Sequence, residues 1–219
     1  MMLLHADRSQ RIVVLPADRV WREQEAGATV CSLETLPGLL ESSFVRLPAG
    51  KPLETRAGED LEIFVLDGLL AIGAHIWPAA SYLRIAGDSA LSVFSKQSSL
   101  LFLKAGKFPE SDRKSVGLGT VGVQFSPGIV PGLSVLPLYS GGAVNTALVR
   151  WDPGTTFQPH RHFGGEEILV ISGTFEDEHG SYPAGSWYRA PHMSRHHPFS
   201  REGCLIFVKT GHLLDASAA

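Results

Sequence analysis

The stretch "EILVISG", residues 167–173, occurs in nearly the same form as "EIFVLDG" at residues 62–68, and this pair decides the fold. Each copy is short, rich in β-branched and aromatic residues, and closed by a glycine, which is typical of a β-strand. Adding 105 to a position in the first half reaches its counterpart in the second half, so that Lys104 falls on Lys209. The correspondence runs over about eighty residues and indicates an internal repeat.

The other apolar runs have the same character, and none shows a long helical stripe. "SYLRI", "SSLLFLK", "TALVRW" and "GCLIFVK" carry apolar residues at consecutive positions, as strands do when both of their faces are covered. We therefore expect an all-β fold of two tandem β-barrel or jelly-roll domains. The first comprises residues 1–106 and the second residues 127–219. Residues 107–126, which mix charge, glycine and proline, form the connection.

Composition excludes several classes of protein. The chain has 219 residues, a net charge of −3 and no basic stripe, so we expect no nucleic-acid partner. There is no signal-peptide core and no run of about 18 apolar residues, which predicts a cytoplasmic protein without a membrane partner. Cys31 and Cys204 are far apart and form no CxxC pair, which argues against a disulfide framework and a cysteine zinc cluster. We interpret Cys204 as a buried small residue.

The stretch "PHRHFGGEE", residues 159–167, raises the question of a metal site. Successive side chains of a strand alternate between its faces, so His160 and His162 point the same way. Glu166 lies four residues further on, after two glycines that suit a tight turn, and its carboxylate can fold back onto the histidines. Taken alone, an HxH pair is weak, and two partly exposed strand histidines remain the simpler interpretation.

The spacing around this pair resembles the conserved motifs of the cupin family. Gly154, His160, His162, Glu166 and Gly173 satisfy the first motif, G-x5-H-x-H-x3-E-x6-G, without adjustment. The resemblance implies a small antiparallel barrel in which these two histidines and Glu166 are metal ligands.

The second cupin motif, G-x5-P-x-G-x2-H-x3-N, is met in part. Gly185, Pro191 and His196 are in place, while Met193 and Ser200 replace the usual glycine and asparagine. The resemblance makes His196 the fourth metal ligand, in preference to its neighbours His192 and His197. Met193 and Ser200 fall where we expect turns, so they affect the loop shape more than the metal.

The first repeat shares the framework without the histidines, so the chain resembles a bicupin with one metal site. In the 105 register, the positions that correspond to the four ligands hold Thr55, Ala57, Leu61 and Leu91; a register shifted by one residue gives Arg56 and Gly58 in place of the two motif histidines. We expect this half to be a structural packing partner.

The ligand set predicts one divalent transition metal. Three imidazoles and one carboxylate suit Zn, Fe, Ni, Cu, Co or Mn, and without sulfur the set does not choose among them. Four ligands would close a tetrahedral zinc site, whereas an octahedral ion would keep two positions open. The side chains of Gln158, Ile168 and Val170 are expected on the same face, where they would line a small pocket for an organic ligand or simply belong to the core.

A closer resemblance concerns residues 150–191, "RWDPGTTFQPHRHFGGEEILVISGTFEDEHGSYPAGSWYRAP", followed by "PFSREGCLIFVK". This stretch is similar to the cupin domain of ChrR-type anti-sigma factors, zinc proteins that restrain an extracytoplasmic-function sigma factor until an oxidative signal arrives. That family binds its sigma factor through an N-terminal helical domain with an HxxxCxxC zinc motif, and no such motif occurs here. The resemblance implies zinc first, with iron, nickel or manganese as alternatives.

Two functions follow as hypotheses, and the sequence leaves open whether the chain is an enzyme. The first is a regulatory, stress-sensing metal module that acts in transcription regulation through a protein partner. The second is a non-haem metal-dependent dioxygenase for a small dicarbonyl substrate, because acetylacetone-type dioxygenases also resemble this class. A purely structural metal is the third alternative. The sequence is compatible with a homodimer.

Overall fold

The computed structural model describes residues 3–25, 27–36, 40–53, 55–87 and 92–213, and within them the chain is built almost wholly of β-strands. The expected all-β fold class is confirmed. Contacts group the chain into two compact units, residues 1–6 with 20–123 and residues 7–19 with 124–219. No helix among the described residues is long and apolar enough to cross a membrane.

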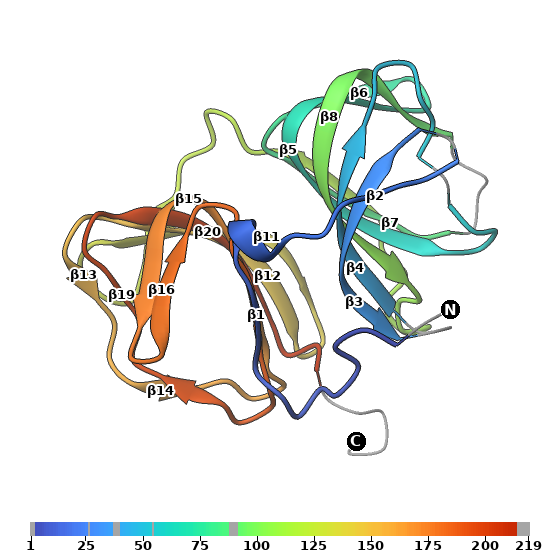
Figure 1. Ribbon diagram of the computed structural model, residues 1–219. Helices are drawn as coiled ribbons and strands as arrows, with labels where there is room; N and C mark the ends of the chain where they lie inside the picture. Colours follow the sequence, from blue (N-terminus) through green and yellow to red (C-terminus); the bar gives the residue numbers. More distant parts are fainter. Residues whose placement is uncertain (1–2, 26, 37–39, 54, 88–91, 214–219) are drawn as a thin grey trace. The chain divides into compact units, whose positions relative to one another are not determined.

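The first unit is one twisted antiparallel sheet closed around an apolar interior (Figure 1). Its strand order is β2-β3-β4-β8-β5-β7-β9, and β6 pairs with β5. The strands are β2 (Arg22–Glu23), β3 (Thr29–Leu36), β4 (Leu40–Leu47), β5 (Asp60–Ile72), β6 (His75–Pro78), β7 (Ser81–Ile85), β8 (Val93–Gly106) and β9 (Val116–Gly119).

The second unit repeats this arrangement with the order β1-β17-β15-β20-β12-β11-β10. Its elements are β1 (Ile12–Val14), the 3-10 helix η1 (Pro16–Asp18), β10 (Ser126–Pro127), β11 (Leu133–Gly141), β12 (Val144–Trp151), β13 (Thr155–Thr156), β14 (His160–Arg161), β15 (Glu166–Asp177), β16 (Gly180–Pro183), β17 (Trp187–Ala190), β18 (Arg195–His196), β19 (Phe199–Ser200) and β20 (Cys204–Thr210).

Strand pairing repeats with the offset of 105 that the sequence shows. In the first unit Leu61 of β5 lies opposite Ala105 of β8, and in the second Glu166 of β15 lies opposite Thr210 of β20. The same pair of strands therefore forms the centre of each barrel, and corresponding residues occupy corresponding places.

One pair of elements is exchanged between the repeats. Strand β9 lies within the expected connection, residues 107–126, yet it pairs with β7 of the first unit. Strand β1 lies within the first repeat as the sequence defines it, yet it pairs with β17 of the second unit, and in Figure 1 it runs among the orange strands. The first barrel is thus completed by a short strand from the expected connection, and the second by a short strand from the first repeat's sequence.

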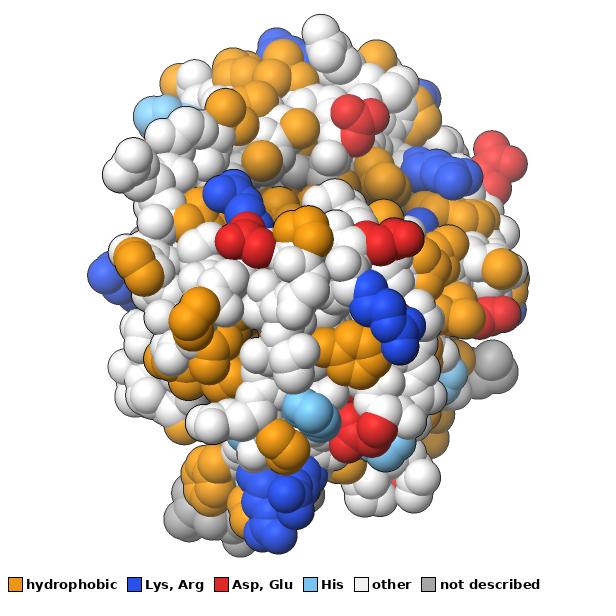
Figure 2. Space-filling model, turned by 90° about the vertical axis from the view of Figure 1, so that its left-hand side faces the viewer, with side chains coloured by type: hydrophobic (Ala, Val, Ile, Leu, Met, Phe, Trp, Pro, Cys, Tyr) orange, Lys and Arg blue, Asp and Glu red, His pale blue; other side chains and the backbone are white. Residues whose placement is uncertain are grey.

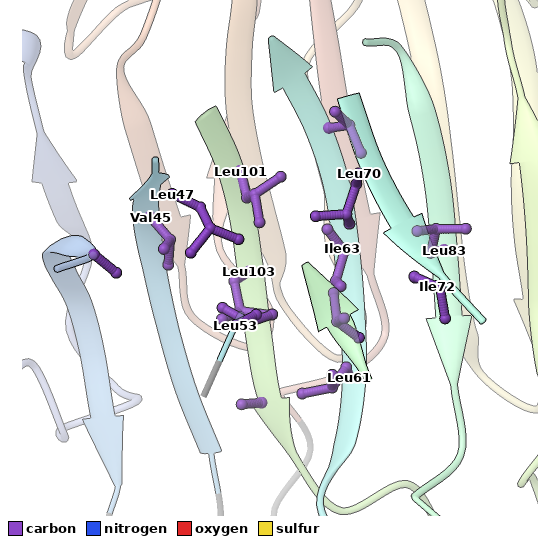
Figure 3. Close-up of a cluster of buried hydrophobic side chains, with 14 residues drawn as sticks. Val45, Leu47, Leu53, Leu61, Ile63, Leu70, Ile72, Leu83, Leu101 and Leu103 are labelled. Carbon is purple, nitrogen blue, oxygen red and sulfur yellow. The ribbon is translucent and has the colours of Figure 1, made fainter. Parts of the chain in front are cut away.

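Apolar side chains fill each barrel. In the first, Figure 3 shows leucine and valine side chains from β4, β5, β7 and β8 converging on one interior. The second core gathers Ile168, Val170, Phe175 and Ile206 among others. Cys31 and Cys204 are buried and unbonded to each other, and burial raises the pKa of the Cys204 thiol to about 11, as expected for an inert core residue.

Candidate metal centre

Four polar side chains meet at one end of the second barrel. His160 begins β14 and lies opposite His196 of β18, so the two are cross-strand neighbours. His162 follows β14, and Glu166 begins β15. Strands β14 and β18 form a two-stranded sheet separate from the main sheet of this unit, to which β15 belongs.

A double-glycine turn brings Glu166 back towards the histidines. Gly164 and Gly165 have φ angles of +74° and +73°, which favour glycine. A Cβ at Gly164 would lie 2.6 Å from the Cα of Gly211, and one at Gly165 would lie 2.5 Å from Leu213. The sequence "HFGGE" therefore makes this turn because no side chain fits at either glycine.

The ligand atoms lie within reach of a single ion. The Nε2 atoms of His162 and His196 are 3.0 Å apart, and Glu166 Oε2 is 3.4 Å and 3.6 Å from them. The imidazoles of His160, His162 and His196 each offer a nitrogen within 4.8 Å of the others. Two atoms bound to one ion at about 2.1 Å are separated by roughly 3.0–3.4 Å, which is close to the distances among His162, His196 and Glu166, while the His160 nitrogen is within 4.8 Å of the other two imidazoles.

One oxygen of the Glu166 carboxylate, Oε2, is buried and accepts no hydrogen bond from the described residues. Burial raises the pKa of this carboxyl to about 7, although the nearby His196 acts in the opposite direction. A divalent cation would relieve this unpaired oxygen, so the residues present fit a metal ion.

Two of the three imidazoles, those of His162 and His160, have lowered pKa values that suit them to metal binding. Burial, and then the charges of His196 and His160, lower the pKa of His162 to about 3. Burial also lowers the pKa of the half-buried His160. A neutral imidazole has a lone pair available for coordination at physiological pH.

Hydrogen bonds at Nδ1 orient two of the three rings. His160 Nδ1 lies 2.9 Å from the carbonyl oxygen of Gln158, and His196 Nδ1 lies 3.4 Å from Asp177 Oδ2. When these nitrogens carry the proton and donate it, Nε2 of each ring is free to bind a cation.

Asp177 is itself held firmly. Its buried carboxylate accepts hydrogen bonds from the backbone N–H of His179 at 2.8 Å and from the hydroxyl of Tyr182 at 2.9 Å, and it pairs with Arg11 at 2.8 Å. Burial alone would raise the pKa of Asp177, but His196, these donors and the Arg11 charge outweigh it and lower the value to about 2. Asp177 is therefore ionised and fixed behind the His196 ring.

Sequence reasoning missed Asp177 and Arg11. Asp177 carries a weak signal, because it ends β15 just before the "EHG" turn, where a carboxylate can cap backbone N–H groups. Arg11 carries no sequence signal of this contact, because it is 166 residues from Asp177 in the chain.

The other candidate residues take varied positions. Ile168 and Val170 pack in the apolar core, and the side chain of Gln158 is exposed, so its backbone carbonyl makes the contact with His160. His192 lies in a turn, where its Nδ1 accepts from the N–H of Gly164, and His197 is exposed.

The two departures from the second motif differ. Met193 has a φ of +61°, in the left-handed region where the motif has glycine. Ser200 lies in strand β19 and not in a turn, contrary to expectation, because its buried hydroxyl donates to the carbonyl of Thr174 and holds it in the sheet.

The face drawn in Figure 2 shows pale-blue histidine side chains at the surface next to hydrophobic ones. Near the metal centre, the side chains of Phe163 and Met193 are 65% and 45% exposed. Part of the surface around the centre is thus apolar and open to solvent.

Comparison with known proteins identifies the family of the second barrel. Residues 116–214 match the family model of the ChrR Cupin-like domain, and this part of the chain is a cupin-family domain. The match begins at the first residue of β9, so in sequence β9 belongs to the second repeat. No curated protein matches the chain.

Solved structures of similar fold cover nearly the whole chain. A putative dioxygenase from Nostoc punctiforme has a TM-score of 0.75 at 15% identity, over 95% of this chain and 85% of that one. YlbA from E. coli has a TM-score of 0.73 at 14% identity, over 94% and 92%. The oxalate decarboxylase of Lactobacillus farciminis, solved as a formate complex, has a TM-score of 0.64 at 12% identity, over 92% and 86%. At these identities the likeness shows the fold alone, which is that of two tandem cupin barrels.

Proposed function

We propose that the second barrel binds one divalent transition metal, zinc first, and that occupancy of this site is the signal of a cytoplasmic regulatory module of the ChrR type. The proposed ligands are His160, His162, Glu166 and His196. The match to the ChrR Cupin-like domain supports the proposal, since it spans all four.

The observation that carries the regulatory role is the placement of the ligands on two separate sheets. His160 and His196 lie on the two-stranded sheet of β14 and β18, whereas Glu166 begins β15 of the main sheet. We name residues 158–165 and 191–197, which contain the small sheet, the lip. A bound cation would supply the positive charge that ties the lip to β15 through Glu166.

Hydrogen bonds also connect the lip to the rest of the barrel at its two ends. The backbone N–H of Leu213 donates to the carbonyl of Gly164, and that of His197 donates to the carboxylate of Glu178. The bonds from the N–H of His162 to Ser194 and from that of Met193 to His162 stay within the lip, so the part around the imidazoles depends most on the ion. Without a cation the buried Glu166 oxygen lacks a partner, and the lip loses its link through that residue. Metal loss would then release the exposed side chains of Phe163 and Met193 to a changed position, which a protein partner could recognise.

Hydrogen exchange of the metal-loaded and metal-free full chain tests this proposal. We expect metal removal to raise exchange in the lip by at least about tenfold, while β15 and β20 stay protected, because their ladder does not depend on the ion. The His160→Ala, His162→Ala double variant should exchange like the metal-free protein with or without added zinc. Equal protection of the lip in both states would contradict a regulatory role.

A second candidate is a metal-dependent dioxygenase. His160 is only half-buried, so one side of the centre is open, and the putative dioxygenase from Nostoc punctiforme resembles the chain over 95% of its length. Oxygen uptake by the Fe(II)-loaded protein with small diketones would favour this candidate if His196→Ala abolished the uptake. No uptake above that of the variant would leave the regulatory proposal in place.

A further inference from the structure

The first barrel contains a large cavity although it lacks the metal ligands. The cavity has a volume of about 610 Å³, within the range of roughly 300–1,000 Å³ typical of small-molecule sites. The residues that line it include Val45, Leu61 and Leu103 of the apolar interior and the charged residues Glu41, Arg56 and Glu59.

The cavity lies at the place that the metal centre takes in the second repeat. Thr55 and Leu61, which line it, occupy the positions of His160 and Glu166. The strand register confirms the second of these, because Leu61 and Glu166 pair with corresponding residues of β8 and β20. The position of His196 corresponds to Leu91, which lies outside the described residues. Among the described residues, the first barrel has a cavity at the end where the second barrel gathers its imidazoles.

The inner wall of the cavity is apolar. Val45, Leu53, Leu61 and Leu103 belong to the buried core cluster and are labelled in Figure 3, where they point into the barrel. Because these side chains form an apolar wall, they suit a short hydrocarbon body. Burial of such a body in the cavity would be favourable by the hydrophobic effect.

The charged residues that line the cavity, among those described, are Glu41, Arg56 and Glu59, and together they carry a net negative charge. Arg56 pairs with Glu41 at 2.9 Å and with Glu59 at 3.4 Å, and its backbone N–H donates to the other oxygen of Glu59. Two carboxylates therefore surround one guanidinium. A ligand carboxylate would have to displace one of them from Arg56, whereas an ammonium group would complete the pairing by neutralising the excess charge.

We infer that the first barrel binds a small organic cation, an ammonium group on a short hydrocarbon body, with the hydrocarbon against the leucines and the ammonium group beside Glu41. This site is independent of the metal centre and of the regulatory role proposed for it. The first barrel is then a ligand-binding domain and not only a packing partner.

Calorimetric titration of the metal-loaded full chain with three probes tests the inference. Hexylammonium, hexanoate and hexanol share the hydrocarbon and differ in the head group. We expect one equivalent of hexylammonium to bind, and hexanoate and hexanol to bind at least about tenfold more weakly, because only the ammonium forms a charge-assisted hydrogen bond with Glu41. No binding of hexylammonium, equal affinity for all three, or a preference for hexanoate would overturn the inference.

Binding measurements on variants test whether the ligand lies in the cavity of the first barrel. Glu41→Gln should weaken hexylammonium binding about tenfold, whereas Glu110→Gln, at a 91% exposed glutamate of the same unit outside the cavity, should not change it. Ser43→Leu, which adds an apolar side chain inside the cavity, should abolish binding while the melting temperature stays the same or rises. Binding that survives Ser43→Leu, or that is lost in the His160→Ala, His162→Ala variant, would overturn the assignment to the first barrel.

Discussion

The same end of the two barrels is stabilised in two different ways. At the start of β5 in the first barrel, the buried carboxylate of Asp60 accepts from the backbone N–H groups of Gly87 and Phe108, each at 2.6 Å, and pairs with Arg113 at 3.1 Å. At the start of β15 in the second barrel, the corresponding position is Gly165, and the carboxylate of the next residue, Glu166, is buried without a hydrogen bond to its Oε2.

This difference shows that the same fold can either pair a buried carboxylate with protein donors or leave one of its oxygens available to a ligand. Asp60 is satisfied by the protein, so the first barrel needs no ion at this end. One oxygen of Glu166 has no hydrogen bond from the described residues, and in our proposal a metal ion completes the second barrel at this point.

The largest expected effect comes from removing two imidazoles. In the His160→Ala, His162→Ala variant, metal content should fall from one equivalent per chain to none, because two of four ligands are lost and the remaining pair cannot hold the ion. Metal analysis of the purified protein measures this. Thr55→Ala, at the corresponding position of the first repeat, should keep one equivalent. Two equivalents in the parent chain would show that both barrels bind metal.

Removing the Asp60 charge should destabilise the first barrel. Asp60→Asn keeps the shape but leaves Arg113 and two backbone donors with a weaker acceptor, and we expect a loss of about 3 kcal/mol in the free energy of unfolding. Urea unfolding measures it. Glu110→Gln, which weakens only an exposed pairing with the same Arg113, should change stability by less than about 0.5 kcal/mol.

The Asp60 contribution should also depend on pH. Burial would raise the pKa of Asp60, but the backbone donors and Arg113 outweigh it, so the pKa is lowered in the folded state. The stabilisation is therefore present above the unfolded pKa of about 3.9 and is lost as the pH falls below it towards the folded value. The stability gap between the parent chain and Asp60→Asn should be constant from neutral pH to about 5 and narrow below about 4. A gap that persists unchanged at low pH would contradict this assignment.

Asp177 should affect metal affinity by a smaller amount. Asp177→Asn removes the charge behind the His196 ring and should weaken metal binding by about 10–100-fold. Competition titration measures the affinity, and the ¹⁵N shifts of the His196 imidazole report its tautomer, which should become mixed. Glu178→Gln changes the exposed neighbour and should alter neither quantity. An unchanged tautomer in Asp177→Asn would show that Asp177 does not orient the ring.

The smallest effect concerns the lip. Met193 is held at a left-handed φ of +61°, where a side chain with a Cβ is strained. Met193→Gly should stabilise the second barrel by about 0.5–1 kcal/mol, since glycine adopts this conformation freely but loses more entropy on folding. Met193→Ala keeps the Cβ and should give no such gain in urea unfolding. Equal stability of the two variants would mean that the strain is not released.

Much of the fold could be predicted from the sequence, because the repeated strands appear as similar stretches of sequence at a fixed offset. The 105-residue offset that relates Lys104 to Lys209 also relates their strand partners, Glu62 and Glu167. The motif spacing likewise brought His160, His162, Glu166 and His196 to one place, although their role as ligands stays a prediction.

The exchanged strands and the support of His196 could not be predicted. β1 and β9 are three and four residues long, too short for an alternating pattern to identify a partner. The pairing of Arg11 with Asp177 depends on that exchange, so it could not be read from spacing. The candidate ligand Glu166 was found because its neighbours follow a motif, whereas Asp177 contacts His196 through a hydrogen bond that no motif records.

The pairing of β1 with β17 determines the order in which the two barrels can fold. When the chain leaves the ribosome, β9 emerges soon after β7, its partner in the first barrel, so that barrel can close while the rest is still being made. β1 emerges before the strands of the first barrel but pairs with β17, about 175 residues later, and must wait unpaired while those residues are made. The first barrel should therefore fold before the second, while the candidate metal centre, whose Asp177 is held by Arg11 next to β1, matures only after β17 has been synthesised.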